Sequence, residues 1–360
     1  MRTVLRRLGT VLLFAAVAAC FAPTLVPPFM DRIYHRGPVS DHFDGARFRN
    51  LDPDPPRRTR PGGFMSRMLT SDARARWPES VAVTPTVPPA RVEGDEMRVT
   101  WIGHATVLVQ IAGLNILTDP IWSDRASPFS FAGPRRVRAP GVRFDDLPRI
   151  DLVLVSHNHY DHLDLATLRR LWERDRPVIV TSLGNDTILR RAGIASEARD
   201  WGGRVPLGTG AEVIVARVHH WSSRWFVDRN RALWSGFTIR TPAGSIFYAG
   251  DTGWGGGAWV REVARGGPFR LAIIPIGAYE PRDFMRASHI DPAEAVEMFE
   301  ILRPERAIGV HWGTFQLSFE DIDAPRRELA ARLRARNIAP DRFVTVEAGE
   351  SLDVPMPASR

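Results

Sequence analysis

The chain has 360 residues, of which 44% are hydrophobic and 25% charged, and these proportions are typical of globular proteins and exclude wholesale disorder. The formal net charge is +7 and the sequence contains no lysine, so arginine supplies the excess positive charge that favours anionic partners such as phosphates, anionic lipid surfaces or nucleic acid. A single cysteine excludes an intramolecular disulfide and a cysteine-rich zinc finger, so a metal site here must use His, Asp and Glu.

Residues 1–29 have the layout of a secretory signal. Three arginines within the first seven residues precede an apolar run at 11–19, and Cys20 follows. The last four residues of this stretch, Val-Ala-Ala-Cys, resemble a bacterial lipobox, so Cys20 is the predicted lipidation site. The alternative is an uncleaved anchor with its basic residues on the cytoplasmic side, although the apolar run is short for a span of about 20 residues. Both readings predict a membrane-associated protein of the cell envelope, held on the periplasmic side by a lipid or an N-terminal anchor.

Residues 30–97 are predicted to form an irregular strap rich in proline and arginine, because the closely spaced prolines exclude long helices. We interpret this strap as a tether that crosses the surface of the protein. The alternative is a membrane-facing segment with an apolar wedge made of Phe64, Met65, Met68 and Leu69.

Regular patterning covers residues 98–350, the predicted main domain, and leaves 351–360 as a tail. Short apolar runs predict strands at 99–102, 106–111, 115–118, 152–155, 178–181, 213–218, 246–249, 271–276 and 307–310. Helices are predicted to begin after Asp164, at Pro292 behind Asp291, and at Pro325. Batches of strands with helices between them predict an α/β fold of two sheets flanked by helices, although composition alone does not exclude a single doubly wound sheet.

The most informative stretch follows the strand predicted at 152–155. It reads His157-Asn158-His159-Tyr160-Asp161-His162-Leu163-Asp164, so three imidazoles and two carboxylates fall within eight residues at a strand-to-helix junction. Burying so many ionisable groups would be costly without a metal ion. The first two histidines can point the same way because they alternate along an extended segment, and the Asp-His pair after them can reach a second position. The stretch therefore predicts metal ligands.

The same order, a strand followed by potential ligands, recurs three times. The strand at 213–218 leads into His219 and His220, the strand at 246–249 into Asp251, and the strand at 307–310 into His311. With the first stretch included, six of the 10 histidines follow the ends of these four strands. A random distribution of histidines does not explain this. Imidazole and carboxylate without thiolate suit Zn²⁺, with Fe and Mn as alternatives.

We therefore expect two zinc ions, each with three protein ligands and an open position. The first ion is assigned to His157, His159 and His220. The second ion is assigned to Asp161, His162 and His311. Asp251 is the expected bridging carboxylate between them.

The stretch from His157 to Asp164 resembles the HxHxDH signature of the metallo-β-lactamase superfamily. Longer motifs within about residues 98–320 resemble the N-acylphosphatidylethanolamine-hydrolysing phospholipase D family; they lie at 101–106, 117–120, 125–128, 156–164, 275–282, 289–292 and 311–315. The resemblance implies an αβ/βα four-layer sandwich, two zinc ions, and hydrolysis of a phosphodiester to phosphatidic acid and an N-acylethanolamine. It also implies a phospholipid substrate, a membrane surface as partner, and a homodimer with a lipid-accessible groove.

The resemblance also assigns individual residues. It selects His220 rather than His219 as the zinc ligand, and it places His289 near the substrate phosphate. His104 and Asp119 match family residues beside the metals, where such groups orient the ligating side chains. Arg282 is either a phosphate contact or a surface residue.

The mechanism expected from this set is that of a zinc-dependent phosphodiesterase. A hydroxide bridging the two zinc ions attacks phosphorus, while Asp251 holds the nucleophile and accepts its proton and Asp161 holds the second ion. His289 steadies the phosphate or protonates the leaving group; alternatively, it only supports the start of the helix at Pro292.

Other functions stay open. A related hydrolase could open lactones or cleave small phosphodiesters with the same metals, and a tethered metal-dependent binding protein would use the same ligands without catalysis. A nuclease is less favoured, and no nucleic-acid partner is expected, because the arginines are scattered and no platform of interleaved aromatic residues is evident.

Overall fold

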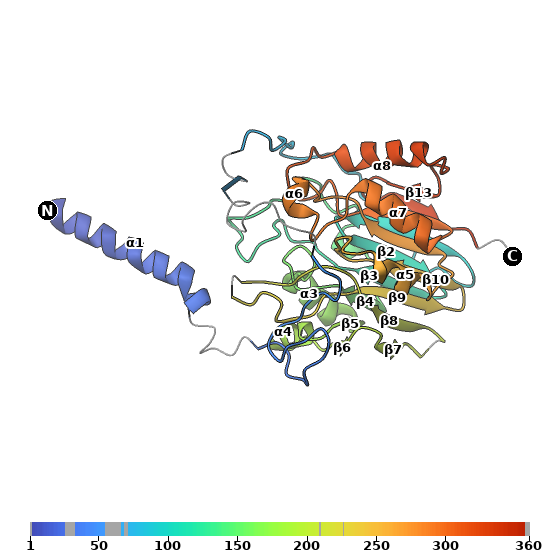
Figure 1. Ribbon diagram of the computed structural model, residues 1–360, viewed down its shortest axis with the longest axis horizontal. Helices are drawn as coiled ribbons and strands as arrows, with labels where there is room; N and C mark the ends of the chain where they lie inside the picture. Colours follow the sequence, from blue (N-terminus) through green and yellow to red (C-terminus); the bar gives the residue numbers. More distant parts are fainter. Residues whose placement is uncertain are drawn as a thin grey trace.

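The computed structural model describes residues 2–25, 33–54, 66–67, 71–208, 210–225 and 227–356. The predicted apolar wedge, Phe64, Met65, Met68 and Leu69, lies outside these residues. Helix α1 (Arg2–Leu25) stands apart from the body of the molecule (Figure 1), and its side chains from 7 to 21 are exposed. Among the described residues, no helix combines the length and the apolar character required to cross a membrane.

Two seven-stranded sheets form the centre of the body. The first has the order β14-β1-β2-β3-β4-β5-β6 and the second the order β13-β12-β11-β10-β9-β8-β7. The strands of the first sheet are β1 (Met97–Gly103), β2 (Thr106–Ile111), β3 (Leu114–Thr118), β4 (Leu152–Val155), β5 (Val178–Ser182), β6 (Glu197–Arg199) and β14 (Ser351–Asp353). The strands of the second sheet are β7 (Arg204–Pro206), β8 (Glu212–Ala216), β9 (Gly236–Thr241), β10 (Gly244–Tyr248), β11 (Leu271–Pro275), β12 (Arg306–Val310) and β13 (Phe343–Val344).

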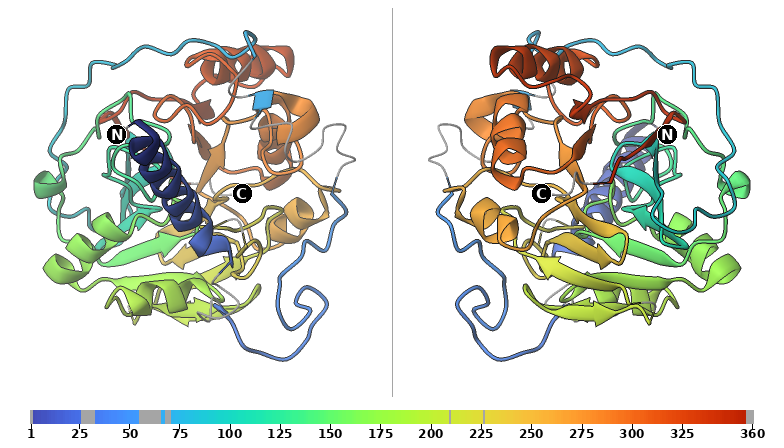
Figure 2. Two further views of the ribbon diagram at one scale, coloured as in Figure 1. Left: turned by 90° about the vertical axis from the view of Figure 1, so that its left-hand side faces the viewer. Right: turned by 90° about the vertical axis from the view of Figure 1, so that its right-hand side faces the viewer.

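Helices cover the outer face of each sheet, as Figure 2 shows. Those of the first sheet are α3 (Leu165–Asp175) and α4 (Asn185–Arg191), and those of the second are α5 (Ala258–Ala264), α7 (Pro292–Leu302) and α8 (Ala324–Ala335). The short α6 (Arg282–Met285) and a 3₁₀ turn, η1 (Phe144–Asp146), lie in connections. The layers therefore run helices, sheet, sheet, helices, which confirms the predicted four-layer α/β sandwich.

Strand β4 shows why this fold buries apolar side chains on both faces of a sheet. Leu152 and Leu154 belong to the core between the two sheets, whereas Val153 and Val155 belong to the core under α3. Because successive side chains of a strand point to opposite faces, a strand buried on both sides is apolar throughout. The metal-ligand stretch thus begins at the end of a strand that is fixed from above and below.

Each predicted strand corresponds to a strand of the structure, and the helix starts are confirmed. Asp164 accepts the backbone N–H groups of residues 166 and 167 at the start of α3, and Asp291 and Glu294 form a capping box at the start of α7. The predicted tail is wrong at its first residues, because Ser351–Asp353 pair with β1 as an edge strand.

The described residues of the strap that precede β1 are irregular, yet part of them belongs to the core. Phe43 and Phe48 are each 2% exposed and pack in the cluster between the sheets. Their rings lie 4.6 Å apart between centroids, and the backbone N–H of Phe48 donates to the carbonyl of Asn230. Residues 33–54 are therefore a built part of the fold and not a loose tether.

Candidate metal centre

The loop after β4 carries four of the predicted ligands and is held tightly by one arginine. The guanidinium of Arg224 donates to the carbonyl oxygens of Asn158 (3.0 Å) and Leu163 (2.8 Å). It also lies 4.0 Å from the ring centroid of Tyr160. Because Arg224 contacts both ends of the loop and its middle, the backbone of the HxHxDH stretch is fixed between the strand and α3.

The first donor group is His157, His159 and His220. His159 Nδ1 lies 2.7 Å from His157 Nε2 and 3.4 Å from His220 Nε2. Asp251 Oδ2 lies 3.9 Å from His157 Nε2 and 3.8 Å from His220 Nε2. One donor atom from each of these four residues lies within 4.8 Å of the other three, so this arrangement is suited to one metal ion.

The second donor group is Asp161, His162 and His311. Asp161 Oδ2 lies 3.3 Å from both His162 Nε2 and His311 Nε2. Asp251 reaches this group as well, with Oδ2 at 3.1 Å from His162 Nε2 and Oδ1 at 3.2 Å from His311 Nε2. The structure thus brings the seven predicted ligands together from four separate segments, with Asp251 between the two groups. Their role as metal ligands stays a prediction.

The hydrogen bonds behind the rings show that the residues fit a cation. His162 Nδ1 donates to Asp119 Oδ2 (2.6 Å) and His220 Nδ1 donates to the carbonyl of Ser288 (2.8 Å). His157 Nδ1 contacts Ser156 Oγ (2.9 Å), whose own proton is donated to Asp119, so His157 is the donor. In the rings of His157 and His220 the Nε2 lone pair therefore points into the shared space, and the ring of His162 directs its Nε2 atom there as well.

Two buried atoms in that space, His162 Nε2 and Asp251 Oδ1, lie close to ionisable neighbours but have no hydrogen bond of good geometry among the described residues. Polar atoms that converge in a buried site without well-formed hydrogen bonds are costly unless a cation satisfies them. The donor set, imidazole and carboxylate without thiolate, suits Zn²⁺ and also Fe or Mn.

The two groups differ in their electrostatics. Burial lowers the pKa of His159 to about 3 and holds the pKa values of His157 and His220 well below the usual range. Burial acts the same way on His311, but the carboxylates of Asp251 and Asp161 outweigh it and raise the pKa of His311 to about 9.

The pKa values of the two carboxylates, Asp161 in the second group and Asp251 between the groups, are lowered. Burial alone would raise their pKa values, yet neighbouring imidazoles, His162 first among them, hold the pKa values of Asp161 and Asp251 well below the usual range. Both carboxylates are therefore ionised at neutral pH, as metal ligands must be.

The two residues predicted beside the metals contact the ligands. Asp119 accepts from Ser156 N (2.7 Å), Ser156 Oγ (2.5 Å), His162 Nδ1 (2.6 Å) and Tyr248 Oη (2.5 Å). His104 donates from Nε2 to Asp161 Oδ2 (2.9 Å), and this nitrogen lies within 4.8 Å of donor atoms of the whole second group. Both placements suit groups that orient metal ligands.

His289 lies at the edge of the site. Its side chain is 12% exposed, and its Nδ1, which has no hydrogen-bond partner among the described residues, is 3.9 Å from Asp251 Oδ2. The start of α7 is capped by Asp291 and Glu294, so the His289 ring is not required to support the helix. Arg282 donates to the carbonyl of His289 (2.8 Å) and to Glu294 (2.7 Å), and its guanidinium therefore secures this turn.

The side chains of His219 and His220 have different surroundings. His220 Nε2 faces His159, whereas His219 Nε2 lies 2.9 Å from Asp54 Oδ1 and belongs to neither donor group. The geometry accordingly favours the residue that the family resemblance selects.

Sequence reasoning missed several residues that hold the ligands: Ser156, Arg224, Tyr248, Ser288 and Asn50. Ser156 and Tyr248 stand at the ends of strands that lead to ligands, which is a usable signal. Asn50 has no such signal, because the residue it contacts is 170 positions away.

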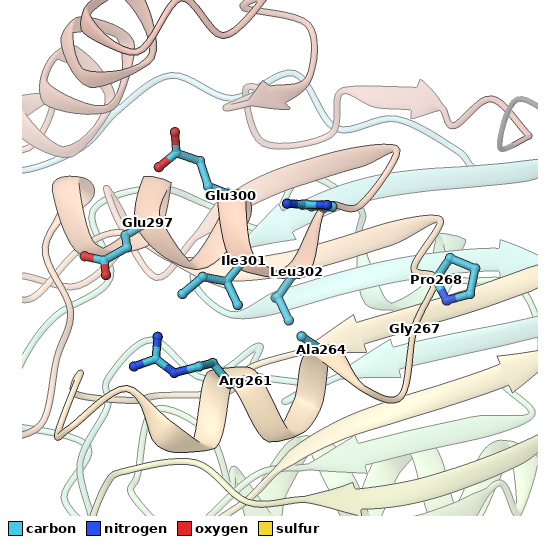
Figure 3. A pocket seen from close by; sticks show the side chains of 9 residues that line it. Arg261, Ala264, Gly267, Pro268, Glu297, Glu300, Ile301 and Leu302 are labelled. Carbon is cyan, nitrogen blue, oxygen red and sulfur yellow. The ribbon is translucent and has the colours of Figure 1, made fainter. Parts of the chain in front are cut away.

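A hollow elsewhere on the surface does not compete with this site. It lies between α5 and α7 (Figure 3), where Arg261 and Glu297 flank a floor that includes Ala264 and Ile301. None of its lining residues belongs to either donor group.

Comparisons with known proteins agree with the geometry. The Beta-lactamase superfamily domain matches residues 114–312. The N-acyl-phosphatidylethanolamine-hydrolyzing phospholipase D 1 of Caenorhabditis elegans is 39% identical over 263 residues, which cover 70% of this chain and 74% of that protein. The mitochondrial N-acyl-phosphatidylethanolamine-hydrolyzing phospholipase D of Saccharomyces cerevisiae is 33% identical over 236 residues, or 64% of this chain and 50% of that protein.

Among solved structures, an isothiocyanate hydrolase from Delia radicum gut bacteria superposes with a TM-score of 0.58 at 22% identity. The match covers 71% of this chain and 98% of that one. At this identity the likeness shows the fold alone.

Proposed function

Because this chain belongs to the metallo-β-lactamase superfamily of metal-dependent hydrolases, we propose that it is a zinc-dependent phosphodiesterase that hydrolyses a phospholipid diester, of the N-acylphosphatidylethanolamine phospholipase D type. The observation that carries this proposal is the position of Asp251, whose carboxylate faces both donor groups at once. The relatives from C. elegans and S. cerevisiae, both named for hydrolysis of this lipid, support the substrate class.

Two zinc ions bound in these groups would supply positive charge that polarises a phosphodiester and lowers the pKa of a bound water molecule. His157, His159 and His220 would hold the first ion, and Asp161, His162 and His311 the second. Three of these rings are already oriented by hydrogen bonds at Nδ1, so little reorganisation is required when the ions bind.

Asp251 is placed to act as the proton acceptor. It is ionised at neutral pH, and its carboxylate faces both donor groups, so it can take the proton of an attacking water. Asp161 would share this end of the site as a ligand, oriented by the N–H of His104.

His289 would act on the other side of the substrate. Burial lowers the pKa of His289 to about 4, so the imidazole is neutral at pH 7 and carries a single N–H. That N–H could donate to a phosphate oxygen, which steadies the phosphate, or to the departing alkoxide oxygen. Its position beside Asp251 Oδ2 and His311 supports this assignment.

The N-terminal helix supports a membrane surface as the place of action. Its exposed side chains include Leu12, Leu13 and Phe14, and the thiol of Cys20 is exposed and unpaired. We propose that this segment holds the enzyme at the periplasmic side of the cell envelope through a lipid on Cys20 or through the helix itself, where phospholipid substrate is concentrated.

A comparison of three substrates tests the proposal. The purified protein, after its metal content is measured, is assayed on N-acylphosphatidylethanolamine vesicles, a short-chain lactone and single-stranded RNA. The proposal predicts about two zinc ions per chain and turnover of the vesicles, with release of phosphatidic acid. If the protein prefers to open the lactone, the proposed function is wrong and the protein is the related hydrolase. If it prefers to cleave RNA, it is a nuclease.

A further inference from the structure

The part of the strap that precedes residue 55 lies against the loop that carries His220. Asn50 contacts both backbone groups of this histidine: its Nδ2 donates to the carbonyl of His220 (2.9 Å), and its Oδ1 accepts from the N–H of His220 (3.2 Å). The amide of Asn50 thus satisfies both the backbone N–H and the backbone carbonyl of His220, as a paired residue on a neighbouring strand does within a sheet.

A tryptophan fixes the orientation of that amide. Trp234 is fully buried and donates from Nε1 to Asn50 Oδ1 (3.1 Å). Because Oδ1 faces two N–H donors and Nδ2 faces a carbonyl oxygen, only one placement of the amide oxygen and nitrogen satisfies all three contacts. A carboxylate in the place of the amide would lose the donor and set an anionic oxygen against the carbonyl of His220.

The ring of His220 is held separately from its backbone. His220 Nδ1 donates to the carbonyl of Ser288 (2.8 Å), which leaves Nε2 directed at His159. A ring held only at Nδ1 could still tilt or slide with its backbone, so the position of Nε2 depends on both contacts. Asn50 and Ser288 together define where this predicted ligand stands.

Asn50 is itself anchored by its neighbours in the strap. Phe48 is buried in the core, and its N–H donates to the carbonyl of Asn230 (2.7 Å). On the other side, Asp52 accepts from the guanidinium of Arg217 (3.3 Å). The amide therefore approaches His220 from a fixed backbone, which makes the contact a built feature of the fold.

We propose that Asn50 is a positioning residue for the first metal site, so that the segment N-terminal to the sandwich completes the metal centre. The inference rests on the proposed metal centre but not on the phospholipid substrate. It predicts that Asn50 acts on metal binding through His220 and touches neither the substrate nor the second donor group.

The test is Asn50→Asp, with metal binding as the readout. The variant and the wild-type protein are stripped with a chelator and titrated with Co²⁺, whose absorption spectrum reports the ligands at each site, and with Zn²⁺ against a competing chelator. Removal of groups that orient a ligand typically weakens metal affinity by about tenfold to a hundredfold. We expect that loss at the first site, while affinity at the second site stays near the wild-type value.

Asp44→Asn is the matched control. Asp44 lies in the same strap and accepts the backbone N–H groups of Ala46 (2.8 Å) and Arg47 (2.7 Å) at an exposed turn, and it has no contact with the donor groups. We expect its metal titration to match the wild-type curve. Equal losses in Asp44→Asn and Asn50→Asp would show that any loosening of the strap has this effect, and would overturn the inference.

Thermal unfolding of the metal-free proteins separates positioning from folding. A positioning role predicts similar melting temperatures without metal and a smaller rise on adding Zn²⁺ for Asn50→Asp. If that variant does not fold, Trp234→Phe removes the indole N–H that is donated to Asn50 Oδ1 (3.1 Å) and to the carbonyl of Val218 (3.3 Å). It keeps the amide of Asn50 and should weaken the first site less, in the same direction. Wild-type affinity at the first site in whichever variant folds would overturn the inference. Failure of the lipid assay alone would leave it intact.

Discussion

The two donor groups sit side by side, yet the protein prepares them differently. The first is made of imidazoles whose pKa values are lowered by burial, and its oriented rings donate to neutral acceptors, Ser156 Oγ and the carbonyl of Ser288. The second mixes imidazole with carboxylate, and its supports are charged or ionisable: His162 donates to Asp119, and Asp161 accepts from His104.

This difference separates what each group requires before a cation can bind. The first group is already neutral at pH 7, so its affinity depends mainly on how well the rings are placed. The second group holds protonated imidazole against carboxylate in the metal-free protein, because the pKa values of His162 and His311 are raised. A cation must therefore displace protons there, and its affinity depends on pH as well as on geometry.

The largest effect is expected where the two groups meet. Asp251→Ala removes the carboxylate shared by both, so we expect loss of both metals and of bis-p-nitrophenyl phosphate hydrolysis down to background. The loss should exceed the roughly hundredfold effect of removing a supporting group. His157→Ala and His162→Ala, each confined to one group, should each lose one metal first, as measured by metal analysis after dialysis.

His219→Ala is the control for these losses, since His219 belongs to neither donor group, although its Nε2 contacts Asp54 (2.9 Å) and Asn50 Nδ2 (3.4 Å). It should keep both metals. Full metal content and turnover in Asp251→Ala would contradict the dinuclear arrangement. Loss of one metal in His219→Ala that exceeds the loss expected for Asn50→Asp, about tenfold to a hundredfold, would show that the wrong histidine of the pair has been assigned.

The next effect concerns pH. The pKa of His311 is raised to about 9 in the metal-free protein and that of His162 is raised as well. Below pH 9 each unit of falling pH should therefore lower metal affinity at the second site by about tenfold for each proton that the cation displaces. The first site should respond little between pH 7 and 9, because His159 has a pKa of about 3. Metal titrations by calorimetry in buffers of different ionisation enthalpy would measure the protons released at each site.

The raised pKa of His311 also determines how the stability of the metal-free protein changes with pH. A raised pKa in the folded state means that the His311–Asp251 pair stabilises the metal-free protein fully below the unfolded pKa of about 6.5, and that this contribution is lost as pH rises through about 9. A second-site affinity that is flat from pH 7 to 9 would remove the proposed contrast between the groups.

Most strands, the helix starts and the predicted ligands could be identified from the sequence because each depends on residues that are close together in the chain. The strand at 106–111 is a short run rich in aliphatic residues and the strand at 152–155 is a continuous apolar run, and the structure has both with the predicted limits. Asp164 and Asp291 identify helix starts because capping depends on residues a few positions apart. The predicted ligands could be selected because they follow such strands directly.

The rest depends on contacts between distant residues. Strand β14 has three residues and exists because it pairs with β1, about 250 positions earlier. Tyr248 looks like an ordinary core aromatic until Asp119 is seen at its hydroxyl, and Asn50 lies in a proline-rich segment with no regular pattern. Neither periodicity nor residue spacing reports such partners, and only the folded arrangement shows them.

The smallest effect tests whether the charged support of the second group matters as proposed. Asp119 accepts from Tyr248, from Ser156 and from His162, and Tyr248 is fully buried. Tyr248→Phe keeps the packing of the ring and removes one of these donors, at a cost of about 1 kcal/mol or about fivefold in affinity.

Asp119→Asn is the stronger companion variant. It alters the acceptor for His162 itself, so we expect metal affinity to fall by about tenfold to a hundredfold. Both losses should fall on the second site, because the first site retains His220 with its contacts to Ser288 and Asn50. A loss that Tyr248→Phe spreads equally over both sites would show that Asp119, through Ser156 and His157, supports the two groups together.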